Sequence, residues 1–287
     1  MIIFKRHFKI YAVISLLIFI LVLCILYKLP VKNSLSELKP NQLRIHYIDV
    51  GQGDAALIQI NNKNLLIDSG PDKKAYLYLR KLGIKTLDYV IITHPHEDHI
   101  GGLNYIIKNI NTKTYYLPNV ISSSESFKNV LQSLRSKNFN VSTGKAGIKI
   151  DLDKNLSLLM LSPVNNLYTE INHYSIVLKL NFMETSFLFC GDSEIINEEE
   201  ILSKGYNIDS DIIKIAHHGS NSSTSENFLN EVSPKVAVIS VGKDNEYGHP
   251  HKETLLKLKN KNIQLFRTDL QGTIVLESDG YKILRRK

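Results

Sequence analysis

Short apolar runs alternate with segments of helical periodicity along most of the chain. Apolar runs rich in β-branched residues predict strands at 43–48, 55–60, 64–67, 87–92, 114–117, 156–161, 175–180, 186–190, 211–216 and 236–241. Helical periodicity predicts helices at 73–82, 103–107, 124–134, 194–202 and from Glu253 onward. Ser193 is expected to cap the helix at 194–202. This order of elements predicts an α/β fold in which sheet layers are covered by helices.

The first part of the chain has a different pattern. Residues 10–27 form an uncharged apolar run of roughly 18 residues, which is long enough to cross a bilayer as one helix. Three basic residues precede the run, which favours a cytoplasmic N-terminus and an extracytoplasmic C-terminal domain, although two lysines also follow it. No small-x-small cleavage signal lies behind the run, so an uncleaved anchor is favoured over a signal peptide. The predicted organisation is a membrane anchor at 1–28, a linker at 29–42 and one globular domain at 43–287.

The net charge of +7 is unevenly distributed. Residues 1–40 contain six basic residues and one acidic residue, a net +5, which leaves +2 for the rest of the chain. The basic residues at 282–287 more than account for that remainder, so the total charge is weak evidence for a polyanionic partner. Cys24 and Cys190 have neither metal-site nor redox spacing, and no disulfide framework is expected.

Four side chains of metal-binding type lie in one loop between a predicted strand and a predicted helix. His94 and His96 follow the strand at 87–92 and, two residues apart in extended backbone, point to the same side. Asp98 and His99 lie where the chain turns before a glycine pair, and can point at a second position close by. Imidazole and carboxylate together suit Zn²⁺, Mn²⁺ or Fe²⁺, so the loop predicts a metal site.

Other predicted loops also contain polar residues that suit chemistry. Two glycines in the sequence DVGQGDA, at 49–55, permit a tight turn that leaves Asp54 facing a site, although the loop also fits an ordinary hairpin turn. Asp192 follows the strand at 186–190, where it is either a helix-start residue or a ligand. His217 and His218 follow the strand at 211–216. One is expected to bind metal, with His218 favoured, and the other to contact substrate.

The loop at 94–99 resembles the HxHxDH signature of the metallo-β-lactamase-fold hydrolases. Four further motifs look like the metallo-β-lactamase-like domain at the C-terminus of the ComEC competence proteins: DVGQGDA at 49–55, IDSG at 67–70, AHHGS at 216–220 and YGHPH at 247–251. The resemblance covers about residues 43–285. It implies a four-layer αββα sandwich in a bacterial membrane protein, with the predicted anchor in place of the polytopic channel part of a ComEC protein.

The resemblance also implies two divalent metal ions, Zn²⁺ or Mn²⁺, as cofactors. The implied metal ligands are His94, His96, Asp98, His99, Asp192 and His218. The two histidines that begin the loop would bind one ion, and the Asp–His pair that ends it would bind the other together with His217 or His218. Asp192 would bridge the ions, which reduces their repulsion. Many relatives bring a further histidine to the first ion, for which His173 and His249 are the candidates here. A water-rich first site is the alternative.

These features predict a membrane-anchored metal-dependent phosphodiesterase or nuclease acting on DNA, with a competence or channel protein as an expected partner. Asp98 is a predicted catalytic residue, and Asp54, His217 and His249 are candidates for orienting water or protonating the leaving group. Two alternatives remain open. One is a hydrolase of another exported substrate, such as a cell-wall phosphodiester, and the other is a non-catalytic metal-stabilised binding module.

Overall fold

The structure, a computed structural model, describes residue 15, residues 18–19 and residues 38–286. The chain divides into two compact units, and the second, Leu38–Lys287, contains every element discussed below. The predicted membrane anchor at 1–28, apart from three of its residues, and most of the predicted linker at 29–42 lie outside the described residues. Within the described part, no helix combines the length and apolar character needed to cross a bilayer.

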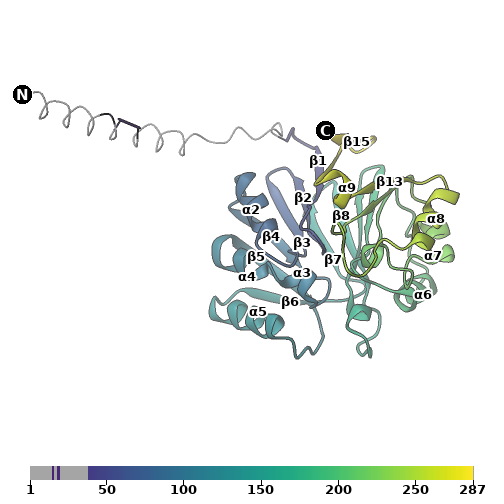
Figure 1. Cartoon of the computed structure of the whole chain (residues 1–287), viewed down its shortest axis with the longest axis horizontal. Helices are drawn as coiled ribbons and strands as arrows, with labels where there is room; N and C mark the ends of the chain where they lie inside the picture. The colour runs from purple at the N-terminus through teal and green to yellow at the C-terminus, as the bar shows by residue number, and fades with distance from the viewer. Residues whose placement is uncertain (1–14, 16–17, 20–37, 287) are drawn as a thin grey trace, which may run out of the picture. The chain divides into compact units, whose positions relative to one another are not determined.

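An eight-stranded mixed sheet, sheet A, forms the first half of the domain (Figure 1). In spatial order its strands are β15 (Ile283–Arg286), β14 (Ile274–Ser278), β1 (Leu43–Tyr47), β2 (Ala56–Ile60), β3 (Lys63–Ile67), β4 (Thr86–Ile91), β5 (Asn111–Pro118) and β6 (Asn140–Gly144). Neighbours from β15 to β3 pair antiparallel, and neighbours from β3 to β6 pair parallel. The loops that follow β3 and β4 therefore leave from the same edge of the sheet.

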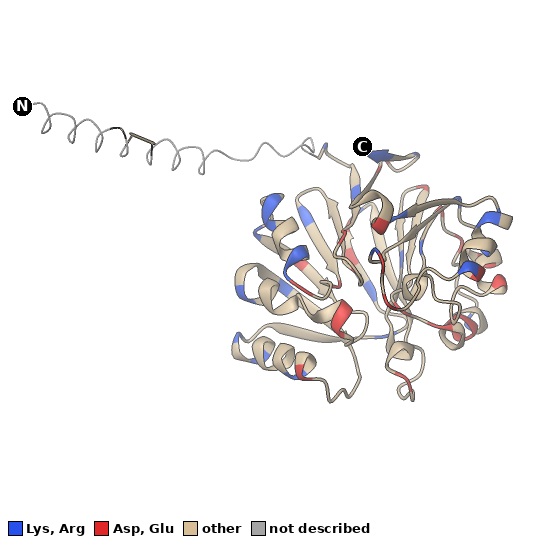
Figure 2. Ribbon diagram, viewed as in Figure 1, with Lys and Arg blue, Asp and Glu red and all other residues tan. Residues whose placement is uncertain are grey.

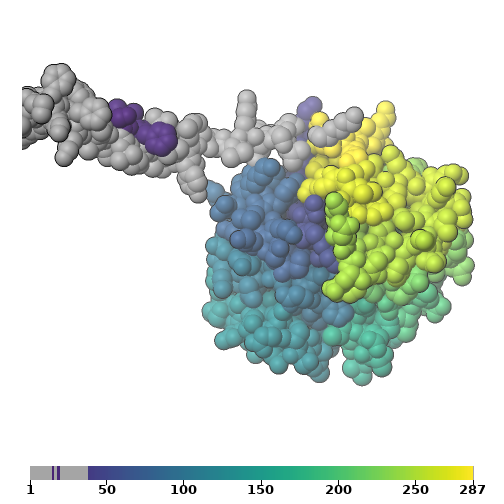
Figure 3. Space-filling view, viewed as in Figure 1, coloured from purple at the N-terminus to yellow at the C-terminus, as the bar shows by residue number. Residues whose placement is uncertain are grey.

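A seven-stranded sheet, sheet B, forms the second half. In spatial order its strands are β13 (Gln264–Arg267), β12 (Val236–Ile239), β11 (Ile212–Lys214), β10 (Thr185–Phe189), β9 (Val177–Phe182), β8 (Leu156–Ser162) and β7 (Lys149–Asp153). The strands from β10 to β13 pair parallel, so the loops after β10, β11 and β12 also share one edge. In Figure 3 the blue and teal residues lie side by side with the green and yellow ones, although β14 and β15, at the yellow end of the colour scale, belong to sheet A.

Helices cover the outer face of each sheet. The three over sheet A are α2 (Lys74–Lys81), α4 (Leu103–Asn109) and α5 (Glu125–Ser136), and the three over sheet B are α6 (Ile195–Ser203), α7 (Glu226–Val232) and α8 (Lys252–Asn260). One apolar cluster fills the space between the sheets, and a separate cluster lies beneath each helix layer. The predicted four-layer αββα sandwich is therefore confirmed, with each layer held by burial of apolar surface.

The predicted strands and helices are present, with ends that differ by three residues or fewer. The structure adds α7, the one-turn helices α3 (Glu97–Ile100) and α9 (Thr268–Gln271), and five strands: β6, β7, β13, β14 and β15. β6 and β7 were missed because their sequences, NVSTG and KIDLD, contain no continuous apolar run. The prediction that Ser193 caps α6 is wrong. Glu194 is the N-cap, its N–H donating to Asn197 Oδ1 (3.1 Å), while Ser193 N–H donates to Cys190 O in the preceding turn.

Candidate metal centre

The predicted metal loop follows β4 and runs into the short helix α3 (Glu97–Ile100). His94 and His99 are fully buried, and Asp98 remains 30% exposed at its side chain. A tight turn places the loop against its neighbours: a Cβ on Gly101 would lie 2.1 Å from Pro71 O, so only glycine fits there. The loop is therefore held close to its neighbours, with two imidazoles buried and the Asp98 carboxylate partly exposed.

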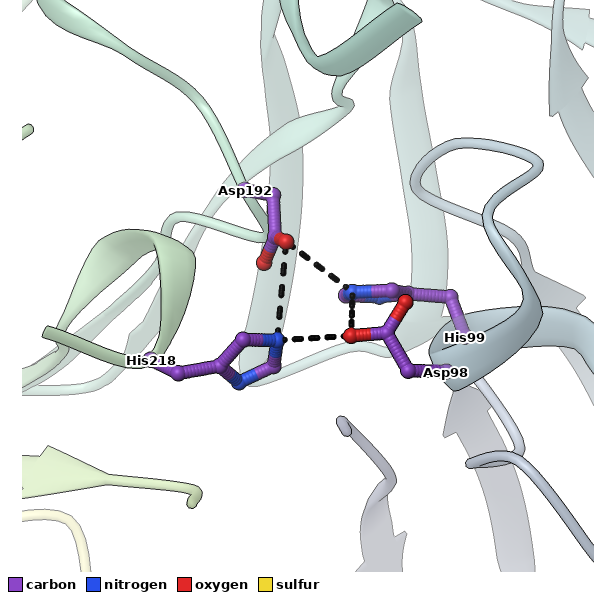
Figure 4. A group of neighbouring side chains, drawn as sticks. All are labelled: Asp98, His99, Asp192 and His218. Carbon is purple, nitrogen blue, oxygen red and sulfur yellow. Dashed lines mark hydrogen bonds and ion pairs between the residues drawn. The ribbon is translucent and has the colours of Figure 1, made fainter. Parts of the chain in front are cut away.

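Four side chains from distant parts of the chain converge at one point. One donor atom from each of Asp98, His99, Asp192 and His218 lies within 4.8 Å of the others. Figure 4 shows them pointing toward one another, with Asp98 and His99 entering from α3 and the other two from turns on the opposite side. His218 Nε2 lies 3.0 Å from Asp98 Oδ2 and 3.5 Å from Asp192 Oδ2, and His99 Nε2 lies 3.3 Å from that same Asp192 oxygen.

Two further histidines, His94 and His217, also approach Asp192. His94 Nε2 is 3.9 Å from Asp192 Oδ2 and 3.0 Å from His96 Nδ1. His217 Nε2 is also 3.9 Å from Asp192 Oδ2. Asp192 Oδ2 thus lies near donor atoms of His94 and His217 as well as those of His99 and His218, an arrangement that suits the bridging role predicted for it. The division of these residues between two metal ions stays a prediction.

Left-handed backbone explains how two adjacent histidines reach one site. His217 and His218 have φ values of 48° and 53° in the 3-10 turn η2 (Ala216–Gly219), which follows β11. In a continuing strand their side chains would point to opposite faces. The tight turn instead brings both Nε2 atoms within 4 Å of Asp192 Oδ2. Such conformations are costly for non-glycine residues and gather at functional sites.

The donor atoms fit a divalent metal ion. His99 Nε2 and Asp192 Oδ1 are buried without a hydrogen-bond partner, a state that costs free energy unless something else binds them. Outer contacts hold the ligands in place, because His99 Nδ1–H donates to Asp68 Oδ2 (2.8 Å) and His218 Nδ1–H donates to Ser240 O (2.9 Å). Each imidazole therefore presents Nε2 to the centre.

The electrostatics of the cluster also favour a cation. Burial raises the pKa of Asp192, but His218 and His99 outweigh that effect and hold it well below its usual value. Burial lowers the pKa of His99, yet Asp192, Asp98 and Asp68 raise it well above the ordinary value. The carboxylates thus draw positive charge to this point, as protons on imidazole or as a metal ion in their place.

A cleft of about 330 Å³ opens onto the cluster. Its lining includes His96, Asp98, Asp192, His217, His218 and His249. Burial and the neighbouring histidines lower the pKa of His249 to about 4, so its imidazole is neutral at physiological pH. The Tyr247 ring stacks on His249 with centroids 5.8 Å apart and is 60% exposed at the mouth of the cleft.

Two candidate residues lie elsewhere than in the cleft. Asp54 is buried behind His218, where its carboxylate is paired with Lys214. His173 Nε2 is 3.0 Å from Glu194 Oε2, and Glu194 Oε1 lies 3.2 Å from His217 Nδ1. Neither Asp54 nor His173 lines the cleft.

The sequence prediction missed several residues that support the site, Asp68, Lys214 and Glu194 among them. Asp68 directly follows the apolar strand β3, the kind of position that identified Asp192. Lys214 stands inside the apolar run Ile212–Ala216, where an unpaired charge would be costly. Both positions offered a signal in the sequence. Glu194 offered none, because its partners come from other parts of the chain.

Comparison with known families places this geometry in context. The model of the metallo-beta-lactamase superfamily matches residues 48–243, which contain the whole four-residue cluster. ComE operon protein 3 of Bacillus subtilis is 33% identical over 251 residues, covering 80% of this chain and 32% of that protein. Competence protein ComA of Neisseria gonorrhoeae is 29% identical over 239 residues, covering 82% and 32%. The chain thus spans about a third of the length of these relatives.

The solved structure of Tm1679, a metal-dependent hydrolase of the beta-lactamase superfamily, has the same fold. It superposes with a TM-score of 0.53 at 18% identity, covering 78% of this chain and 95% of that one. The predicted resemblance to this superfamily and to competence proteins is confirmed.

Proposed function

This chain belongs to the metallo-beta-lactamase superfamily, and we propose that it is a metal-dependent phosphodiesterase that cleaves DNA. The observation that carries the proposal is the cluster of Asp98, His99, Asp192 and His218 at the base of an open cleft. The similarity to two competence proteins supports a DNA substrate. The site would take Zn²⁺ or Mn²⁺, because imidazole and carboxylate donors suit both.

The residues of the cleft have separable roles in this proposal. One ion would be held by Asp98, His99, Asp192 and His218. A second would be held by His94 and His96, beside Asp192. A bound divalent ion supplies a water-derived nucleophile near neutral pH and stabilises charge on the phosphoryl oxygens. His217 reaches the cleft with its Nδ1 beside Glu194, which orients its Nε2 toward substrate. His249 lines the same wall and, as a neutral imidazole, accepts or donates a proton at the leaving oxygen.

The charge distribution favours a second candidate substrate. Figure 2 shows Lys and Arg scattered over the outer helices rather than gathered in one strip. Tight DNA binding depends on neutralising many phosphates along a basic path. A smaller phosphodiester of the cell envelope needs no such path, so a hydrolase of another exported phosphodiester is the alternative.

We also propose that residues 1–28 anchor the enzyme in the bacterial membrane with the catalytic domain outside. The uncharged run at 10–27 and the preceding basic residues support this arrangement. The similarity to a competence protein supports a competence or channel protein as the expected partner.

The test uses the purified protein with Mn²⁺ or Zn²⁺, assayed on bis-p-nitrophenyl phosphate and on single-stranded DNA. We expect both to be cleaved and expect Asp98→Ala and Asp192→Ala to lose bound metal and cleavage together. Glu277→Gln, far from the cleft, is the matched control and keeps both. Bound metal without cleavage of either substrate would overturn the nuclease proposal and favour another exported phosphodiester or a binding role. Absence of bound metal would contradict the centre itself.

A further inference from the structure

A buried ion pair lies directly behind the metal centre. Lys214, the last residue of β11, pairs with Asp54 Oδ2, and both residues are about 5% exposed or less. Asp54 Oδ1 lies 3.6 Å from His218 Nδ1 and has no hydrogen-bond partner. The pair is close to the ligands but does not line the cleft. The pair therefore contacts the ligand His218 without lining the cleft.

Each member of the pair also fixes one side of the centre. Asp54 N–H donates to Asp98 O (3.1 Å), so its loop is tied to the start of α3. The loop packs so closely that a Cβ on Gly53 would lie 2.2 Å from that same oxygen, at a φ of +135°. Lys214 Nζ donates to Gly191 O (3.2 Å), which belongs to the peptide preceding Asp192. The Asp54–Lys214 contact thus links the backbone at Asp98 to the backbone at Asp192.

The link joins the two sheets. Asp54 lies in the loop between β1 and β2 of sheet A, and Lys214 belongs to sheet B. The four-residue cluster is divided in the same way: Asp98 and His99 follow β4 of sheet A, while Asp192 and His218 follow β10 and β11 of sheet B. A small shift of one sheet against the other would change the separation of the carboxylates. A metal site tolerates errors of only a few tenths of an ångström in its ligand distances.

Stability alone is a poor explanation for this pair. Removing two charges from water costs several kcal/mol, and buried pairs often contribute no more than apolar residues of the same volume. Burial lowers the pKa of Lys214, but Asp54 and Asp192 raise it above the ordinary value, so the ammonium keeps its charge. A lysine kept charged in this position also offsets part of the negative charge of the surrounding carboxylates.

We propose that Asp54 and Lys214 are positioning residues, which set the distance between Asp98 and Asp192 and thereby the affinity of the centre for metal. This inference rests on the metal centre of the proposed function but not on its substrate. It assigns Asp54 a role different from the predicted one of orienting water or protonating the leaving group. In this proposal the two residues, which do not line the cleft, act through the backbone at Asp98 and at Asp192.

The test is calorimetric titration of the metal-free full chain with Mn²⁺ and Zn²⁺. Asp54→Asn with Lys214→Met removes one charge of each sign, so the net charge of the site is unchanged and any loss of affinity reports geometry. We expect metal to bind about 10- to 100-fold more weakly, as when outer contacts of metal ligands are removed. The absorption spectrum of the Co²⁺-loaded variant should also change, because it reports the arrangement of the ligands.

The matched control is Arg44→Met with Glu277→Gln, a buried ion pair of opposite charges in sheet A. It should leave metal affinity and the Co²⁺ spectrum unchanged, because this pair lies at the end of the sandwich away from the metal centre. If the Asp54–Lys214 double variant does not fold, Asp54→Asn with Lys214→Gln replaces it, since two amide side chains can hydrogen-bond to each other and the net charge again stays the same. Metal affinity within about twofold of the unmodified protein in a folded variant would overturn the proposal. Because the readout is binding, failure of DNA cleavage leaves this result unaffected.

Discussion

Buried charged groups at the two ends of the sandwich differ in whether their polar atoms have hydrogen-bond partners. At the end opposite the cleft, Arg44 donates to Glu277 Oε1 (2.7 Å), and Glu277 Oε2 accepts from Gln42 (2.9 Å) and from Arg286. Each carboxylate oxygen there has a partner. At the cleft end, His99 Nε2, Asp192 Oδ1 and Asp54 Oδ1 are buried without hydrogen bonds.

This difference distinguishes charged groups that are paired within the fold from charged groups that are left to bind a ligand. Buried polar atoms are nearly always hydrogen-bonded, because an unpaired one keeps its full desolvation cost. A satisfied pair such as Arg44–Glu277 needs no ligand. The unsatisfied atoms of His99 and Asp192 belong to residues whose donor atoms meet within 4.8 Å, an arrangement that suits a group that the chain does not supply. The comparison therefore identifies the metal centre independently of any motif.

The largest expected effect is at the cleft end. Asp192→Asn keeps the shape of the side chain and removes its charge from between His94, His99 and His218. We expect kcat/KM for bis-p-nitrophenyl phosphate to fall at least about 1000-fold, since metal ions supply several kcal/mol of transition-state stabilisation. Metal content by atomic emission should fall in parallel. Full metal content with full activity would contradict the role of Asp192.

The matched change at the other end should affect stability instead. Glu277→Gln leaves Arg44 buried beside an uncharged amide, so we expect the free energy of unfolding to fall by about 3 kcal/mol. Urea unfolding followed by circular dichroism measures the change. Metal affinity should be unaltered, and an altered affinity would show that the two ends are coupled.

Metal itself should stabilise the fold. An ion that binds only the folded protein raises the free energy of unfolding by about 2.7 kcal/mol at a concentration 100 times its Kd. We expect Mn²⁺ or Zn²⁺ to raise Tm by several degrees and a chelator to reverse the shift. Asp192→Asn should show no such shift, whereas Glu277→Gln should show it in full, from a lower starting Tm.

The smallest effect concerns a histidine whose two nitrogens are both satisfied. His46 accepts from the Tyr78 hydroxyl (2.8 Å) and donates to Gln59 Oε1 (2.9 Å), and burial, together with Arg44, lowers its pKa to about 3 despite the hydrogen bond to Gln59. Below pH 6.5 the unfolded chain binds a proton at His46 that the folded protein does not bind. Its contribution to stability is therefore complete above pH 6.5 and falls by about 1.4 kcal/mol per pH unit down to about pH 3.

The measurement is urea unfolding of the metal-free protein between pH 7 and pH 5, compared with His46→Gln. The unmodified protein should lose stability more steeply than the variant over this range. Equal slopes would show that His46 takes up its proton in the folded state as readily as in the unfolded one.

Local sequence was enough to find much of the fold. Strands such as β4 and β10 end in apolar runs, Tyr89–Ile91 and Phe187–Phe189, and the residues that follow them carry the candidate chemistry. His94 was singled out from that pattern, whereas Asp192 remained either a helix-start residue or a ligand until the resemblance implied a metal ligand. β7 was missed although its sequence, KIDLD, alternates polar and apolar residues as a half-buried strand does, because the strands were predicted from continuous apolar runs. The cap of α6 was misassigned for a similar reason, since Ser193 and Glu194 both suit a helix start and only the backbone path distinguishes them.

The sequence by itself determined which side chains are available for chemistry: the histidines and carboxylates at the ends of apolar strands, in an order typical of one superfamily. The tertiary structure decided which of them meet. Asp98 and His218 are 120 residues apart, yet lie 3.0 Å from each other because sheet A and sheet B pack face to face. The same packing placed Asp54 behind the centre, next to a lysine that no local pattern connects to it. Strand ends follow from short-range propensity, whereas contacts between sheets depend on how the whole core packs.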